Sequence, residues 1–376
     1  MNPQDKQFFE LLRAGLWGTP VESKFTRQML GRYVRVALSQ AVLGVVADVI
    51  ISDESLAGML GAAEIKPLRR FVMSNLSTSR TWNITLQKIV QELRSEGIDP
   101  FVLKGQGIAQ YYPNPDLRQC GDIDLYVGQK DYERTCEIVG AMGAAEDHES
   151  DKEILKHFHT RIGNVPVEIH RYTDVYYQKR LDRIYQGISD EGLSAEPVMV
   201  DIAGFKIKTP PIDFNVFYIF NHLWHHFIAD GVGLRQICDW AMLLHKYHEQ
   251  INLDHLQGML EKMGLMKQWK VFGNIAVDVV GLPKDEFPFY DSSYVKLTEK
   301  VYRLVMLEGN FGQANLKDDN RPSGYLAGKL HSLTFRLKRN FRVLALFPKD
   351  SLRHIHRVAA IGIKAVLKDA FSSQKK

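Results

Sequence analysis

Acidic residues at alternate positions mark the part of the chain best suited to chemistry. Asp122 and Asp124 lie in the run DIDLYV, and Glu168 and His170 lie in the later run VPVEIHR. Side chains alternate faces along an extended strand, so Asp122 and Asp124 should share one face, and Glu168 and His170 should share another. If the two strands are neighbours, roughly 4.8 Å apart, three carboxylates converge on one patch.

Three carboxylates so close together resist joint ionisation unless a positive charge lies among them, and a divalent ion supplies that charge. The ligands are hard oxygens with no cysteine in the same strands, which favours Mg²⁺ or Mn²⁺ over zinc. Two ions roughly 3.5 to 4 Å apart would activate an attacking oxygen and stabilise a departing one. The cluster therefore indicates phosphoryl or nucleotidyl transfer, with Asp122, Asp124 and Glu168 as metal ligands and catalytic residues. Glu168 is also a candidate proton acceptor.

A phosphate-binding turn is predicted upstream, where Lys104, Gly105, Gln106 and Gly107 follow a short apolar run. Glycines let backbone N–H groups approach an anion, and the start of a following helix adds partial positive charge. Arg118 lies on the loop that enters the acidic strand, where it either binds a phosphate oxygen or pairs with an acid.

The run FVLKGQGIAQYYPNPDLRQCGDIDLYV, followed by VEIH, resembles the nucleotidyltransferase superfamily that includes DNA polymerase beta. The likeness is closer to a bacterial group with an LKG, then R..GDIDL, pattern, and it covers most of residues 1–245. It implies that two Mg²⁺ or Mn²⁺ ions bind Asp122, Asp124 and Glu168, and that an acceptor hydroxyl attacks the α-phosphate of an NTP such as ATP. The nucleotide-binding residues that it implies are Lys104, Gly105, Gln106, Gly107, Arg118 and His170. One departure is that Gln106 follows Gly105, where the superfamily usually has serine or glycine. For His170, a purely structural role and the orientation of an acid are equally open.

The spacing of apolar residues predicts an α+β fold, with a small mixed β-sheet core between an N-terminal helical region and a C-terminal helical domain. Strands are expected at 98–103, 122–127, 154–162 and 165–171, a hairpin at 198–208, and helices at 108–112 and 130–142. The predicted division is residues 1–96, 97–210, 211–310 and 311–376, with a linker at 309–328 and a basic last segment.

The helical period after residue 214 carries further polar residues. Arg235 and Asp239 are predicted to pair within one helix, and Trp224 and Trp240 are expected in the core rather than as base-stacking platforms. One helix face should also carry three histidines, for which structural or substrate-contacting roles are favoured over a metal site: His222, His225 and His226.

Composition and charge limit the kinds of binding partner that the sequence predicts. The 376 residues are 45% apolar with a net charge of +4, which is globular and does not predict DNA binding. Residues 331–376 hold eleven Lys or Arg against two acids, so this segment either contacts an anionic surface or RNA or forms an ordinary solvated helix face. Three cysteines without metal or redox spacing, and no apolar run near 20 residues, predict a cytoplasmic protein.

The partners expected are an NTP and a hydroxyl-bearing acceptor, which can be a small molecule, a protein or RNA. Two other readings remain: a noncatalytic nucleotide-binding or partner-binding module, and a kinase-like enzyme that moves the γ-phosphate.

Overall fold

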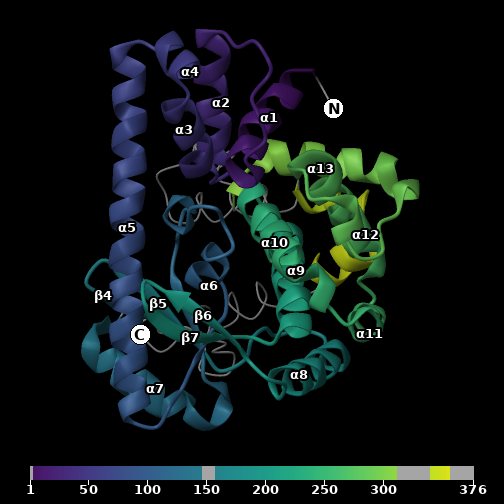
Figure 1. The fold of residues 1–376 in the computed structure, drawn as a ribbon. Coiled ribbons are helices and arrows are strands. Elements are labelled where there is room, and N and C mark those ends of the chain that lie inside the picture. Colours follow the sequence, from purple (N-terminus) through teal and green to yellow (C-terminus); the bar gives the residue numbers. More distant parts are fainter. Residues whose placement is uncertain (1–2, 146–156, 311–338, 356–376) are drawn as a thin grey trace, which may run out of the picture.

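A mixed β-sheet packs between helices from both ends of the chain (Figure 1). The computed structural model describes residues 3–145, 157–310 and 339–355. Within them lies a seven-stranded sheet in the order β3-β4-β5-β2-β1-β7-β6. This architecture confirms the predicted α+β fold class.

The central strands bring distant parts of the sequence together. Strand β2 pairs in parallel with β5 and antiparallel with β1, while β4 and β5 form an antiparallel pair. The predicted hairpin at 198–208 is also present as β6 and β7. The strands are β1 (Phe101–Val102), β2 (Ile123–Tyr126), β3 (Ala144–Ala145), β4 (His157–Ile162), β5 (Val165–His170), β6 (Val198–Ile202) and β7 (Phe205–Thr209).

Helices precede, interrupt and follow the sheet. The first group is α1 (Pro3–Trp17), α2 (Arg27–Ser39), α3 (Leu43–Ser52), α4 (Glu54–Met59) and α5 (Ala62–Ser95). Those that connect the strands are α6 (Gly105–Ala109), α7 (Gly128–Met142) and α8 (Lys179–Leu193). The last group is α9 (Ile212–Ala229), α10 (Leu234–Tyr247), α11 (Leu253–Met263), α12 (Met266–Ile275) and α13 (Val295–Glu308). Short 3₁₀ turns lie at Pro115–Leu117, His248–Gln250, Lys284–Glu286 and Ser292–Tyr294, and a π-helical turn lies at Ala276–Val280.

The 34-residue helix α5 joins the two hydrophobic cores and runs along one side of the molecule (Figure 1). Its first half contributes Leu68 and Val72 to the helical core, and its second half contributes Leu86 and Ile89 to the core beneath the sheet. The helix ends just before Gly97, whose φ of 78° is the left-handed conformation predicted for a glycine at a helix end.

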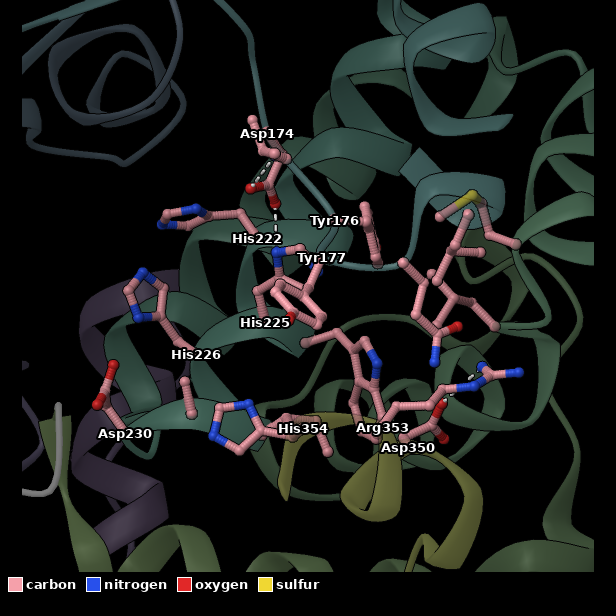
Figure 2. A pocket seen from close by; sticks show the side chains of 18 residues that line it. Asp174, Tyr176, Tyr177, His222, His225, His226, Asp230, Asp350, Arg353 and His354 are labelled. Atoms are coloured by element: carbon pink, nitrogen blue, oxygen red, sulfur yellow. Dashed lines mark hydrogen bonds and ion pairs between the residues drawn. The ribbon is translucent and has the colours of Figure 1, made fainter. Parts of the chain in front are cut away.

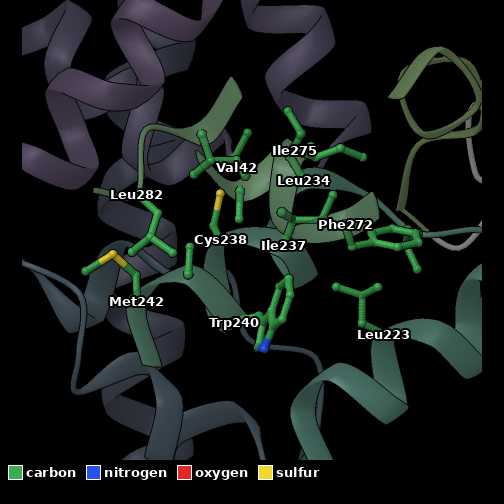
Figure 3. Packing of buried hydrophobic residues seen from close by; sticks show 14 of the residues in the cluster. Val42, Leu223, Leu234, Ile237, Cys238, Trp240, Met242, Phe272, Ile275 and Leu282 are labelled. Atoms are coloured by element: carbon green, nitrogen blue, oxygen red, sulfur yellow. The ribbon is translucent and has the colours of Figure 1, made fainter. Parts of the chain in front are cut away.

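The first and last helices share the larger core. Figure 3 shows Ile237 and Cys238 of α10 among Val42, which precedes α3, and Ile275 of α12. Trp240 is fully buried in this core, as predicted, and so is nearly all of Trp224. The four-part division of the chain at residues 96, 210 and 310 stays a prediction.

Two features of the helical regions differ from the sequence-based expectation. The apolar residues between positions 34 and 45 follow one helical period, but Ala41 has a φ of 55° and separates α2 from α3. The preceding Gln40 is buried, and its side chain binds the backbone of Leu234 and Val305, so tertiary contacts hold the break. Helix α8 was not predicted.

Part of the basic C-terminal segment packs into the fold. Arg339 is buried, forms an ion pair with Glu308 at 3.0 Å, and donates to the carbonyl oxygen of Ile228 at 2.6 Å. Val343 and Phe347 are buried in the helical core. Most of the predicted linker at 309–328 and of the basic segment lies outside the described residues. Among the helices that are described, none combines the length and apolar character needed to cross a membrane.

Candidate functional site

The register of the sheet brings the predicted acids together. Asp124 of β2 lies directly opposite Glu168 of β5, and Asp122 comes just before β2 begins. All three line one cleft of about 320 Å³. Its wall also includes Lys104, Gly105, Arg118 and His170.

Asp124 is the most buried of the three acids, and two basic groups contact the same oxygen. The Lys104 Nζ lies 2.9 Å from Asp124 Oδ1, and the His170 Nε2 lies 2.8 Å from it. His170 Nε2 also lies 3.5 Å from Glu168, which pairs on its other side with His159 Nδ1 at 3.2 Å. His170 therefore orients both acids, which is the second of the two roles considered for it.

The three acids differ in proton affinity. Repulsion from Asp124, together with burial, raises the pKa of Asp122 to about 6. Burial alone would raise the pKa of Asp124, but the Lys104 ammonium and the His170 hydrogen bond hold that pKa below its usual range. Burial is likewise outweighed at Glu168, where hydrogen bonds from His159 and His170 hold the pKa well below its usual range. Asp122 thus carries the least compensated negative charge of the cluster.

The glycine turn lies beside the first acid. Gly105 has a φ of 50°, which disfavours a side chain, and a Cβ there would lie 3.3 Å from the Asp122 carbonyl oxygen. Helix α6 starts at this glycine, three residues earlier than predicted. Gln106 is buried. Gly107 packs closely against Thr209, because a Cβ at this glycine would lie 2.9 Å from the Thr209 side chain. Neither Gln106 nor Gly107 lines the cleft.

Arg118 takes the second of its two predicted roles, because it pairs with an acid. Its Nε and Nη2 each lie 2.7 Å from a carboxylate oxygen of Asp239, and Tyr112 donates to the same carboxylate at 2.7 Å. The predicted intrahelical pair of Arg235 and Asp239 is therefore replaced by a pair between α10 and the loop before β2. Arg235 instead donates to the Gln119 carbonyl oxygen at 3.0 Å and lines the cleft.

The residues of the cleft fit a divalent ion. Ligand atoms of Asp124, Glu168 and His170 lie within 4.8 Å of one another. Asp122 adds a further carboxylate, whose raised pKa reports unrelieved repulsion. Oxygen donors in such a cluster suit Mg²⁺ or Mn²⁺, and the metal-ligand roles of Asp122, Asp124 and Glu168 stay predictions.

A second cavity, of about 230 Å³, is lined by residues of α9 and is shown in Figure 2. His222 and His226 line both this cavity and the first cleft. His225 projects into the second cavity and pairs with Asp174, a carboxylate that is almost fully buried. Of the three predicted histidines, two thus face both spaces and the third belongs to the second cavity.

Two histidines of β4 were not identified from the sequence, of which His157 lines the first cleft and His159 lies opposite Glu168. His157 and His159 alternate along β4 just as Asp122 and Asp124 alternate along the acidic strand, and they share a sheet face with Glu168. The alternation was present in the run HFHTRI and was the signal that could have identified them.

Two comparisons relate the chain to known proteins, and a search of curated proteins found no match. One similar structure is described as a crystal structure of an antigenic nucleotidyltransferase-like protein from Paracoccidioides brasiliensis. The match has 14% identity and a TM-score of 0.30, and it covers 53% of this chain and 92% of that one. The model of a family described as "uncharacterised nucleotidyltransferase" matches residues 28–277, about two thirds of the chain. The chain therefore belongs to this nucleotidyltransferase family.

Proposed function

We propose that this protein is a metal-dependent nucleotidyltransferase that moves a nucleoside monophosphate from an NTP to a hydroxyl group of an acceptor. The observation that carries the proposal is the alignment of Asp124 with Glu168 across two parallel strands, with Asp122 beside the Gly105 turn. Membership of the nucleotidyltransferase family supports the same chemistry.

In the proposed reaction, the acceptor oxygen forms a bond to the α-phosphorus while the bond from that phosphorus to the bridging oxygen breaks. Pyrophosphate leaves with the electron pair, and the hydroxyl proton passes to a carboxylate. Glu168 is the proposed acceptor of this proton, because it lies opposite Asp124 and lines the same cleft. Divalent ions bound by Asp122, Asp124 and Glu168 would supply positive charge to the phosphate oxygens.

The triphosphate is proposed to lie along the side of the cleft formed by Lys104, Gly105 and Arg235. Lys104 and Arg235 bring two positive charges to this wall, and the glycine permits close approach of the backbone. Arg118, a predicted phosphate ligand, instead fixes the loop before β2 through its bidentate pair with Asp239. We therefore assign Arg118 a positioning role. Gln106 and Gly107, which do not line the cleft, would support the Gly105 turn through packing.

The acceptor is proposed to enter through the second cavity. That space adjoins the cleft at His222 and His226, so a molecule held there can direct a hydroxyl group toward the phosphates. Tyr176, Tyr177 and the Asp174–His225 pair give it aromatic and hydrogen-bonding surfaces. Such a lining fits a hydroxyl-rich acceptor, which can be a small molecule, or a protein or RNA end.

The test uses calorimetry with Mg²⁺ and each NTP, followed by incubation of the protein with α-labelled NTP in a cell extract. The proposal expects pyrophosphate and a labelled acceptor, and expects neither product from Asp124→Asn. Release of a nucleoside diphosphate with transfer of the γ-phosphate would instead identify the kinase-like alternative.

One observation favours the noncatalytic module. Lys104 already pairs with Asp124 at 2.9 Å, so the most buried of the three acids has a positive partner without any ion. Binding of an NTP with the same affinity in Mg²⁺ and in EDTA, and with no turnover in any extract, would support this reading over the enzyme.

A further inference from the structure

Two histidines extend the row of acids across the sheet. In the antiparallel pair of β4 and β5, His159 lies opposite Glu168 and His157 lies opposite His170. Glu168 in turn lies opposite Asp124. His159, Glu168 and Asp124 therefore form one continuous row across three neighbouring strands, with all three side chains on the same face of the sheet.

The spacing of these groups suits a bound ion. The His159 Nδ1 lies 3.2 Å from Glu168 Oε1, and the rings of His157 and His159 are 4.3 Å apart between centroids. One ligand atom from each of His157, His159 and Glu168 lies within 4.8 Å of the others. Tetrahedral coordination at the usual zinc distances separates ligand atoms by about 3.4 Å. Small side-chain rotations would therefore bring the three groups into coordination.

The donor set differs from that of the acid cluster. Two imidazoles and one carboxylate prefer a borderline transition ion, whereas Mg²⁺ prefers oxygen donors alone. Two histidines with a glutamate are also a set that holds Zn²⁺ with one coordination position open. His157 and Glu168 line the cleft, so water or a phosphate oxygen from the cleft can fill that position.

We propose that His157, His159 and Glu168 bind a transition ion of the Zn²⁺ class, next to the hard-ion site of Asp122, Asp124 and Glu168. This proposal rests on the proposed function at one point, because the histidine site and the hard-ion site both use Glu168. Among the described residues, the two donor sets meet at this glutamate, which would bridge unlike ions. The nucleotide would then be held between a hard ion and a softer one.

The test is titration of untagged, metal-free protein with Co²⁺, read by its visible absorption, and then displacement with Zn²⁺ followed by calorimetry. Wild type is expected to bind one ion at this site, and X-ray absorption of the zinc form should report two imidazole ligands. His159→Gln is expected to weaken binding by at least about tenfold. His248→Gln is the matched control, because His248 lies in a short turn outside both cavities. Its affinity should equal that of wild type.

A second pair of measurements separates this inference from the proposed function. Asp122→Asn should keep the Co²⁺ absorption band but lose Mg²⁺-dependent NTP binding. His157→Gln is a further loss variant, and circular dichroism confirms that each variant is folded. Equal Co²⁺ affinity in wild type, His157→Gln and His159→Gln would overturn the histidine site, even if Mg²⁺-dependent nucleotide binding persisted. Loss of nucleotide turnover alone would count against the proposed function and not against the histidine site.

Discussion

The two cavities that share His222 and His226 are built in different ways. The first is lined by four acids, of which Asp124 pairs with Lys104 and His170, and Asp239 pairs with the buried Arg118. The second is lined by aromatic rings and imidazoles, by Asp174, which pairs with His225 and Asn221, and by Asp230, Asp350 and Arg353. Because the first cavity holds Asp122, Asp124 and Glu168 and the second holds Tyr176, Tyr177 and the Asp174–His225 pair, we propose that the first binds phosphates and ions and the second binds the acceptor.

The largest expected effect tests the ion pair that shapes the first cleft. Asp239→Asn leaves the Arg118 guanidinium buried without its counter-charge, so the free energy of unfolding should fall by about 3–5 kcal/mol. Asp350→Asn in the second cavity is the comparison, because Asp350 accepts from the neutral Gln268 amide at 2.8 Å and its one ion pair among the described residues is a longer one, at 3.5 Å, with the exposed Arg353. Its loss should be about 1 kcal/mol. Urea unfolding measures both, and equal losses would contradict the contrast between the cavities.

The next largest effect is expected on the rate of the proposed reaction. Asp124→Asn removes a proposed metal ligand, and the rate of pyrophosphate release from NTP should fall by at least about a hundredfold. Asp254→Asn is the matched control, because Asp254 is exposed on α11 and belongs to neither described cavity. Its rate should equal that of wild type. Similar rates in all three proteins would remove the acids from the mechanism.

Ion binding in the first cleft should depend on pH. The Asp122 carboxyl, with a pKa of about 6, must lose its proton before it can bind an ion. Mg²⁺ affinity should therefore rise by up to about tenfold per pH unit below pH 6 and level off above it. The same raised pKa means that Asp122 makes the ion-free fold less stable as pH rises from about 4 to 6. Calorimetry across this range checks the affinity, and a slope unchanged in Asp122→Asn would contradict the assignment.

The smallest effect on nucleotide binding is expected from the second cavity. His225→Gln removes the imidazole partner of Asp174 and changes no residue of the acid cluster, so the Kd for Mg²⁺–NTP should stay within about twofold of wild type. Transfer of label from NTP to the acceptor should nevertheless fall. Unchanged transfer would mean that the acceptor binds elsewhere, and a large change in Kd would mean that the two cavities form one site.

The sequence was most informative where the pattern is local. Alternation along DIDLYV and VPVEIHR predicted which side chains share a face, and the glycines predicted the turn at Gly105. The period of 3.6 residues located the helix found at Gly128–Met142 and the helical character of the regions before and after the sheet. Each of these signals depends on residues within a few positions of one another, so a single sequence contains it.

What could not be predicted depends on distant contacts. Asp239 is 121 residues from Arg118, and nothing in the helix containing Asp239 distinguishes this partner from Arg235. The second cavity likewise combines segments near residues 174, 225 and 350. The break at Ala41 is held by Gln40, whose partners lie in α10 and α13. In these cases tertiary contacts select one partner or one backbone conformation among alternatives that the local sequence favours about equally.

The most direct test of the central claim is a crystal structure with Mn²⁺ and an NTP analogue that cannot be cleaved between its α- and β-phosphates. Anomalous scattering should reveal manganese in contact with Asp122, Asp124 and Glu168, with Lys104 moved from Asp124 and the phosphates beside Gly105. A nucleotide bound elsewhere, or bound here with Lys104 still on Asp124 and no manganese among the three acids, would contradict it.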